Sequence, residues 1–187
     1  MKEHDLILVT DMQNVYTRGQ AWACLDTEGA AARIERIVRE AERRYSSPKV
    51  LFTEYLAPEH PVGAWKVYNE TYAVINADPY LNALLPEMKS LSEKYPVYSK
   101  STYSSMSIPE VRASAEAAER VVLTGVVSEC CVLSTAFAAI DLGCHVVWLK
   151  DAVSGFDRDK ERGAELMLEG LSPVHTTLMT TEEYLEE

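Results

Sequence analysis

Two adjacent cysteines, Cys130 and Cys131, stand where a strand is expected to turn into a helix. The apolar run 121–123 ends at Thr124 and Gly125, which is typical of a buried parallel strand followed by a tight turn. Small and apolar residues then recur at helical spacing after Cys131, and Gly143 is placed as the helix C-cap. The sequence therefore predicts a thiol in the first turn of a helix.

A thiol in this position can act as a nucleophile. The positive end of the helix dipole favours the thiolate, so the position predicts a lowered cysteine pKa. The free N–H groups of the first helical turn can also bind an oxyanion. The alternative is a structural role, because free cysteine is among the most buried residue types and both thiols would then be small core residues.

Asp11 and Lys100 also follow strand-like segments. Asp11 comes directly after the continuous apolar run 6–10, and Lys100 follows the short run 97–99. Taken alone, Asp11 is better explained as a turn or capping residue, and a lone lysine is usually exposed to solvent. In a parallel sheet, however, the carboxyl ends of all strands meet at one edge, which would bring Asp11, Lys100 and Cys131 together.

These three residue types form a working set for thiol chemistry. A carboxylate can take the thiol proton, and a nearby ammonium stabilises the negative charge that results. The histidines are not placed for this work, since none lies in the three segments: His4, His60, His145 and His175. The sequence therefore favours an Asp-Lys-Cys arrangement over a Cys-His pair.

Strands and helices alternate along the whole chain. The predicted strands cover 6–10, 49–53, 97–99, 121–123, 145–149 and 175–179. The predicted helices cover 26–45, 108–118, 160–171 and 180–185, together with the helix after Cys131 and a part-helical segment at 81–91. The segment 63–77 carries several aromatic residues and is predicted to be a loop that covers the pocket or folds on its own side chains. This pattern predicts an α/β fold with a three-layer αβα arrangement and a doubly wound, mostly parallel sheet.

Composition narrows the function classes. The 187 residues, 47% of them hydrophobic, predict one domain over 1–187. A net charge of -11 argues against binding to nucleic acid or to an anionic membrane. The N-terminus has too few apolar residues for a signal peptide, so we expect a soluble, cytoplasmic protein with a small-molecule partner. The four cysteines include an adjacent pair and no CxxC spacing, which supports neither a disulfide framework nor a zinc site.

Three motifs resemble one known family, the isochorismatase-like cysteine hydrolases, which include nicotinamidases and N-carbamoylsarcosine amidase. The nucleophile segment LTGVVSECCVLSTAFAAIDLG is similar to the family pattern G-x-x-[TS]-x-x-C-V, matched at Gly125, Ser128, Cys131 and Val132. The opening LILVTDMQN resembles the family strand that ends in D-x-Q-N. The stretch YSKSTYSSM resembles the lysine segment K-x-x-[YF]-S, matched at Lys100, Tyr103 and Ser104.

The resemblance implies residue roles that composition cannot supply. It makes Cys131 the nucleophile, Asp11 the general base and Lys100 the third catalytic residue. It also implies that main-chain N–H groups of Val127 and Cys131 hold the oxyanion, beside a cis peptide between Val126 and Val127. A homo-oligomer, either dimer or tetramer, is implied as well.

Substrate-binding residues are expected in loops around the catalytic set. The candidates are Gln13, Trp22, Tyr55, Trp65 and Tyr103. Tyr16 lies near the Asp11 strand end and could line the pocket with Trp22, although packing explains both equally well.

No metal or other cofactor is expected. Metal-dependent relatives carry an Asp-x-His pair and further histidines in the loop after the second strand. Here Glu54, Leu56 and His60 occupy that loop, and two ligands are too few for a first-row metal.

The expected activity is hydrolysis of an amide or ureido C–N bond in a small molecule, through a thioester. One alternative is hydrolysis of a vinyl ether in an isochorismate-like substrate, which need not use a cysteine. Another is a catalytically silent binding module. Nothing in the sequence names the substrate.

Overall fold

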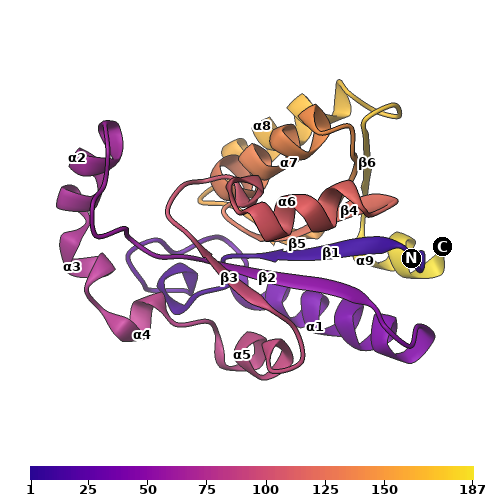
Figure 1. The fold of residues 1–187 in the computed structure, drawn as a ribbon, viewed down its shortest axis with the longest axis horizontal. Coiled ribbons are helices and arrows are strands. Elements are labelled where there is room, and N and C mark those ends of the chain that lie inside the picture. Colours follow the sequence, from indigo (N-terminus) through magenta and orange to yellow (C-terminus); the bar gives the residue numbers. More distant parts are fainter.

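A six-stranded parallel sheet forms the centre of the computed structural model, which describes residues 1–187 (Figure 1). The strands are β1 (Asp5–Thr10), β2 (Lys49–Tyr55), β3 (Val97–Lys100), β4 (Arg120–Val126), β5 (His145–Ser154) and β6 (Thr176–Met179). Their order across the sheet is β3-β2-β1-β4-β5-β6, and every neighbouring pair is parallel. The chain therefore winds outward in both directions from β1, which confirms the predicted doubly wound α/β fold.

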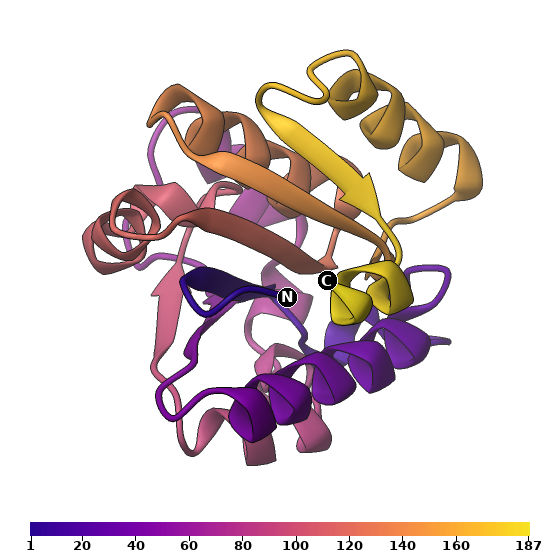
Figure 2. The ribbon, with the colours of Figure 1, turned by 90° about the vertical axis from the view of Figure 1, so that its right-hand side faces the viewer.

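Helices cover both faces of the sheet (Figure 2). The longer ones are α1 (Thr27–Arg44), α5 (Pro86–Ser92), α6 (Pro109–Glu116), α7 (Leu133–Asp141), α8 (Arg158–Glu169) and α9 (Thr181–Glu186). Helices α1, α5 and α9 share one hydrophobic cluster with the sheet, and α6, α7 and α8 share the other. No helix has the length and the apolar character needed to cross a membrane.

Strand β1 shows why the sequence forms this sheet. All six of its residues are buried, because successive side chains point to opposite faces and both faces are covered. Ile7 and Val9 pack in the α1 cluster, while Leu6 and Leu8 pack in the α6–α8 cluster. Each such side chain contributes about 1.5–3 kcal/mol by leaving water. An uninterrupted apolar run is thus the signature of this central strand.

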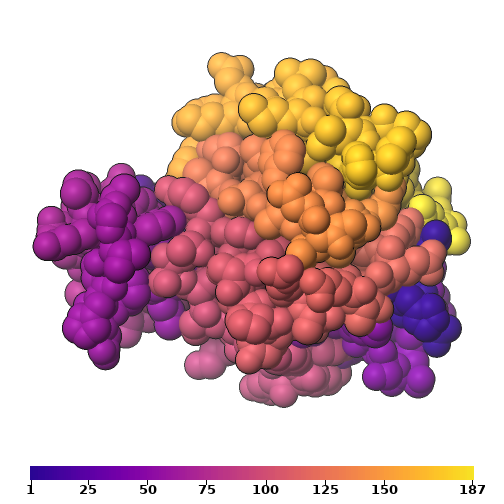
Figure 3. Space-filling model, turned by 45° about the horizontal axis from the view of Figure 1, so that its top comes forward, coloured from indigo at the N-terminus to yellow at the C-terminus, as the bar shows by residue number.

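The segment 63–77 corrects the sequence analysis. It is not a loop, because it forms the helices α2 (Ala64–Thr71) and α3 (Ala73–Asn76), followed by the single turn α4 (Pro79–Asn82). Trp65, Tyr68 and Tyr72 stand three and four residues apart, which is the spacing of one helical face. No residue of α2 or α3 is buried, and this part of the chain projects from one side of the body (Figure 3). The chain termini lie at the other end of the molecule (Figure 1).

Other boundaries differ by a few residues. β2 continues to Tyr55 and β5 to Ser154, so both strands are longer than the apolar runs that identified them. The helix after β4 opens with a π-helical turn, Ser128–Val132, before α7 begins. Such π turns are frequent at functional sites, and this one carries both central cysteines.

Candidate active site

Asp11 is held at the carboxyl end of β1 by an unusual backbone conformation. Its φ angle of 52° lies in the left-handed region, which aspartate tolerates better than most residues. The residue is 0% exposed. Its Oδ1 atom accepts a hydrogen bond from Thr53 Oγ1 at 3.0 Å, and its Oδ2 atom accepts one from Lys100 Nζ at 2.6 Å. Asp11 is therefore a fully buried carboxylate with a counter-ion, rather than a surface turn residue.

Lys100 is the last residue of β3 and reaches across β2 to the end of β1. Its side chain is 0% exposed, so the alternative of a solvated lysine is wrong. Besides Asp11, the ammonium donates to the main-chain oxygen of Thr102 at 3.1 Å. Burial lowers the pKa of Lys100, but the charge of Asp11 and the hydrogen-bonding contacts with Asp11 and Cys131 outweigh burial and raise it overall. The ion pair stays charged because both partners are present.

Gly125 lets β4 pass close to Asp11. Its φ angle is 99°, and a Cβ at this position would lie 2.1 Å from the main-chain oxygen of Thr10. Only glycine accepts both conditions without strain. The pairing of β4 with β5 also shifts register between Leu123 and Gly125. The glycine at the head of the nucleophile motif is thus explained by the close approach of two backbones.

Cys131 lies in the π turn that follows β4 and is 4% exposed. The peptide bond between Val126 and Val127, where β4 ends and the turn begins, is cis, as the resemblance implies. The N–H of Val127 donates to no acceptor in the protein. The main-chain oxygen of Cys131 accepts from Thr135 Oγ1 at 2.7 Å, and the same hydroxyl accepts from the N–H of Ser105 at 2.9 Å. Thr135 therefore ties the cysteine turn to the segment that follows β3.

The thiol of Cys131 does not have the lowered pKa that its place near a helix start predicts. Burial raises its pKa well above the ordinary range, and the charge of Asp11 raises it further, while Lys100 opposes them. Desolvation disfavours the thiolate more strongly than the helix terminus favours it. Asp11 and Lys100 both act on the sulfur, so the three predicted residues are brought together. In the free protein the thiol holds its proton.

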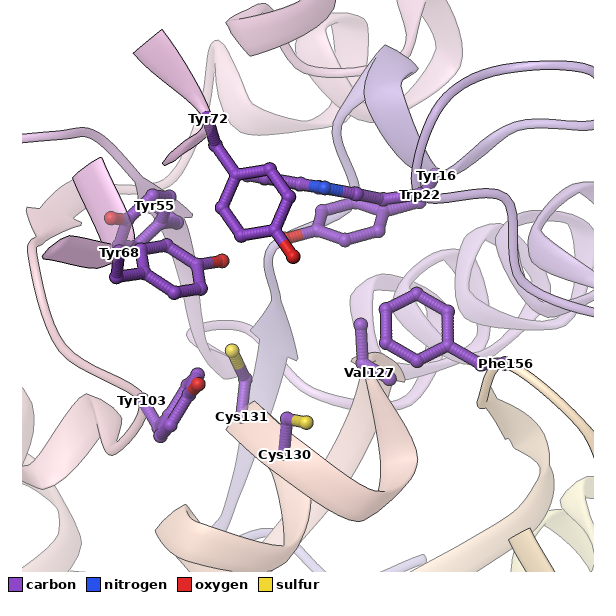
Figure 4. Close-up of a pocket in the computed structure, with 10 residues that line it drawn as sticks. All are labelled: Tyr16, Trp22, Tyr55, Tyr68, Tyr72, Tyr103, Val127, Cys130, Cys131 and Phe156. Carbon is purple, nitrogen blue, oxygen red and sulfur yellow. The ribbon is translucent and has the colours of Figure 1, made fainter. Parts of the chain in front are cut away.

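A cavity of about 200 Å³ opens over the thiol (Figure 4). It is lined by Tyr16, Trp22, Tyr55, Tyr68, Tyr72, Tyr103, Val127, Cys130, Cys131 and Phe156. The close-up shows the sulfur of Cys131 pointing toward the space between the aromatic rings. Trp22, Tyr55 and Tyr103 were predicted from the sequence to surround the substrate, and all three line this cavity.

Gln13 and Trp65, also predicted as substrate-binding residues, do not line the cavity. The side-chain amide of Gln13 forms its hydrogen bonds with the main chain. Its Nε2 donates to the main-chain oxygens of Tyr55 and Asn82, and its Oε1 accepts from the N–H of Tyr55. Trp65 packs edge-on against Tyr103, with ring centroids 4.8 Å apart. Both residues support lining residues instead of contacting the space.

Two kinds of lining residue were missed as binding residues. Tyr68 and Tyr72 come from α2 and its C-terminus, and their helical spacing was a signal in the sequence. Phe156 follows the carboxyl end of β5, and no local pattern identifies it. Cys130 lines the cavity beside Cys131 and is half-buried.

The residues present do not fit a metal ion. No three His, Cys, Asp or Glu side chains are grouped to hold one. Glu54 lies within β2, where its carboxylate accepts a hydrogen bond from Ser99 Oγ at 2.8 Å, and His60, in the loop after β2, is exposed. Leu56 between them offers no donor atom.

Comparison with known proteins gives consistent results. The model of the isochorismatase domain family matches residues 5–183. Comparison with curated protein sequences gives no match. Among solved structures, a cysteine hydrolase from Pseudomonas syringae pv. phaseolicola is 16% identical, with 98% of this chain and 91% of that chain covered and a TM-score of 0.77.

Two other solved structures have the same fold. A nicotinamidase, SaPncA from Staphylococcus aureus, is 16% identical, with 95% of this chain and 98% of that chain covered and a TM-score of 0.70. A MAR1 ribonuclease from Caenorhabditis elegans is 21% identical, with 98% of this chain and 80% of that chain covered and a TM-score of 0.74. At these identities the similarity establishes the fold, and it leaves the reaction of this chain to be argued from its own site.

Proposed function

The chain belongs to the isochorismatase domain family of hydrolases, and from this premise we propose that it cleaves the C–N bond of a small amide or ureido compound with Cys131 as nucleophile. One observation carries the proposal. A buried Asp11–Lys100 ion pair acts on a buried thiol that forms part of the wall of an apolar cavity. This set contains a nucleophile, a proton acceptor and a balancing charge.

In the first half of the reaction, Asp11 takes the proton from the Cys131 thiol as the sulfur attacks the substrate carbonyl. The raised pKa of the thiol means that transfer occurs at the moment of attack, when a bond to carbon replaces the bond to hydrogen. The carbonyl oxygen becomes negative, and the N–H groups of Val127 and Cys131 are its proposed donors. The unpartnered N–H of Val127 supports this assignment.

Collapse of the tetrahedral intermediate breaks the C–N bond. Asp11 gives its proton to the departing nitrogen, so ammonia or an amine leaves as a neutral molecule and a thioester remains on Cys131. Water then attacks the thioester while Asp11 accepts one of its protons. The carboxylic or carbamic acid is released, and the proton returns to the sulfur. Lys100 remains in contact with Asp11 at 2.6 Å, so its positive charge balances the negative charge that arises in the site during these proton transfers.

Three alternatives fit the site less well. An isochorismate-like vinyl ether carries two carboxylates, and no residue that lines the cavity is charged. A silent binding module would gain nothing from a buried ion pair beside a thiol, since such pairs rarely add stability. Cleavage of RNA, suggested by the MAR1 ribonuclease named above, would require an anionic polymer to approach a chain of net charge -11.

The test is a panel of primary amides and ureido compounds, screened for ammonia release by the wild type, Cys131→Ala and Cys130→Ala. Removing the nucleophile is expected to lower kcat by at least about a thousandfold. Cys130→Ala is the matched control, because Cys130 lines the same cavity without the family spacing, and it should keep most of the activity. Mass spectrometry of acid-quenched enzyme should find the acyl group on Cys131. Equal losses in both variants, or an acyl group elsewhere, would exclude Cys131 as the nucleophile.

A further inference from the structure

Several of the aromatic rings around the cavity meet at steep angles, although Trp22 is inclined by only 35° to Tyr16 and 40° to Tyr68. Trp22 and Tyr72 have centroids 5.3 Å apart and an interplanar angle of 85°, and Tyr68 and Tyr72 are 4.8 Å apart at 61°. Tyr55 and Tyr68 also meet at 85°. A flat ring is bound best between two parallel faces, whereas walls at right angles enclose a compact, rounded group. The cavity above Cys131 therefore has the shape of a box and not of a slot.

The box offers no cationic side chain to pair with an anion. Its ten lining residues are all uncharged. The nearest buried cation, Lys100, is already paired with Asp11. Lys160 lies 5.8 Å from the Phe156 ring centroid and is paired with Asp157. The chain as a whole carries a net charge of -11, so its long-range field attracts cations and repels anions.

Tyrosine hydroxyls supply partial negative charge inside the box. The hydroxyls of Tyr68 and Tyr72 point toward the cavity in the close-up (Figure 4), and neither makes a hydrogen bond within the protein. Aromatic faces attract cations through their quadrupole, most strongly when water is excluded. Several perpendicular aromatic faces with free phenolic oxygens form the arrangement that binds methylated ammonium groups.

We propose that, among the small amides of the proposed function, this cavity selects those that carry a methylated ammonium group at the end away from the reacting carbonyl. The inference rests on the proposed function for the reaction, and on the aromatic box for the choice of substrate. The carbonyl would lie at Cys131, and the rounded cationic head would lie among Trp22, Tyr68 and Tyr72.

The test compares three amides of the same shape with different charge. Trimethylammonioacetamide is the cation, 3,3-dimethylbutanamide is the neutral isostere with carbon in place of nitrogen, and sulfoacetamide is an anion with a tetrahedral head. Each kcat/KM is divided by the alkaline hydrolysis rate of the same amide, which removes the inductive effect of the charge. The normalised kcat/KM of the cation is expected to exceed that of the neutral isostere by at least about tenfold, and the anion should have the lowest value.

Variants identify the source of the preference. Trp22→Leu and Tyr72→Leu remove an aromatic face and keep an apolar side chain, so each should lower kcat/KM for the cation about tenfold and change that for the neutral amide less than threefold. Tyr80→Leu is the matched control, because Tyr80 lies on α4 with 61% of its surface exposed and does not line the cavity. It should leave both values unchanged.

A binding measurement separates this inference from the proposed reaction. Tetramethylammonium chloride and tert-butanol are titrated against the wild type at constant ionic strength, and the readout is the change in tryptophan fluorescence that is absent in Trp22→Leu, since the chain also contains Trp65 and Trp148. Binding of the cation at least about tenfold tighter than the alcohol supports the box even if no amide is hydrolysed, in which case the proposed reaction fails alone. Amide turnover without a preference for the cation overturns the inference and leaves the reaction standing. Equal affinity for the two probes also overturns it.

Discussion

Replacing Asp11 by asparagine should destabilise the protein in a way that depends on pH. The substitution keeps the shape of the side chain and removes the charge that balances Lys100. Both side chains of the pair are 0% exposed, and the only other acceptor for the ammonium is the Thr102 oxygen at 3.1 Å. Removing one partner of a buried ion pair typically lowers the free energy of unfolding by about 3–5 kcal/mol, because the remaining charge is left without compensation.

The variant can limit this cost by releasing the Lys100 proton. Keeping an amine of ordinary pKa, about 10.4, neutral at pH 7 costs about 4.6 kcal/mol, and at pH 9 about 2 kcal/mol. In Asp11→Asn the pKa of Lys100 thus falls below its value in the unfolded chain. The unfolded state then binds more protons, so the stability of the variant rises with pH. We expect a loss of about 3–4 kcal/mol at pH 7 and of no more than about 2 kcal/mol at pH 9.

The assay is urea unfolding at pH 7 and at pH 9. At each pH, the free energy of unfolding of the variant is compared with that of the wild type. The control is the double variant Asp11→Asn/Lys100→Met, in which no buried charge remains. It should be more stable at pH 7 than Asp11→Asn alone, and its loss relative to the wild type should not shrink between pH 7 and pH 9 as that of Asp11→Asn does. A loss below about 1 kcal/mol at pH 7, or one that is the same at pH 9, would refute the argument that the pair is buried and charged.

Two further predictions concern the thiol and the reaction. Because burial and Asp11 raise the pKa of Cys131, iodoacetamide should alkylate it more slowly than free cysteine at pH 7, and the rate should still rise at pH 9, where a thiol of ordinary pKa about 8.5 approaches its limit. A rate that levels off below pH 8, measured by mapping the alkylated peptide, would mean that the thiol is activated in the free protein. Amide turnover should survive dialysis against a strong chelator, because Asp11, Lys100 and main-chain donors suffice for the proposed steps, and loss of activity that one added metal restores would contradict this.

Local sequence determined the sheet and predicted which residues would meet at its edge. Continuous apolar runs such as 6–10 can only be buried on both faces, and their alternation with helical segments requires parallel strands. Parallel strands gather their carboxyl ends at one edge, so Asp11, Lys100 and the cysteine turn had to converge once each was known to follow a strand. The resemblance to the family pattern then favoured Cys131 over Cys130 as the predicted nucleophile. These conclusions depended on residues adjacent in the chain.

Only the tertiary structure decided the environment of these residues. The pKa of Cys131 depends on burial and on two charges that arrive from β1 and β3, so a local feature such as a helix start could not give its sign. Likewise, the cavity is lined by side chains as far apart in the sequence as Tyr16 and Phe156, and Gln13 and Trp65 are not among them. Burial and electrostatic energy are sums over neighbours in space. The sequence by itself therefore predicted which residues would carry the chemistry, and the packing of distant segments determined what surrounds them.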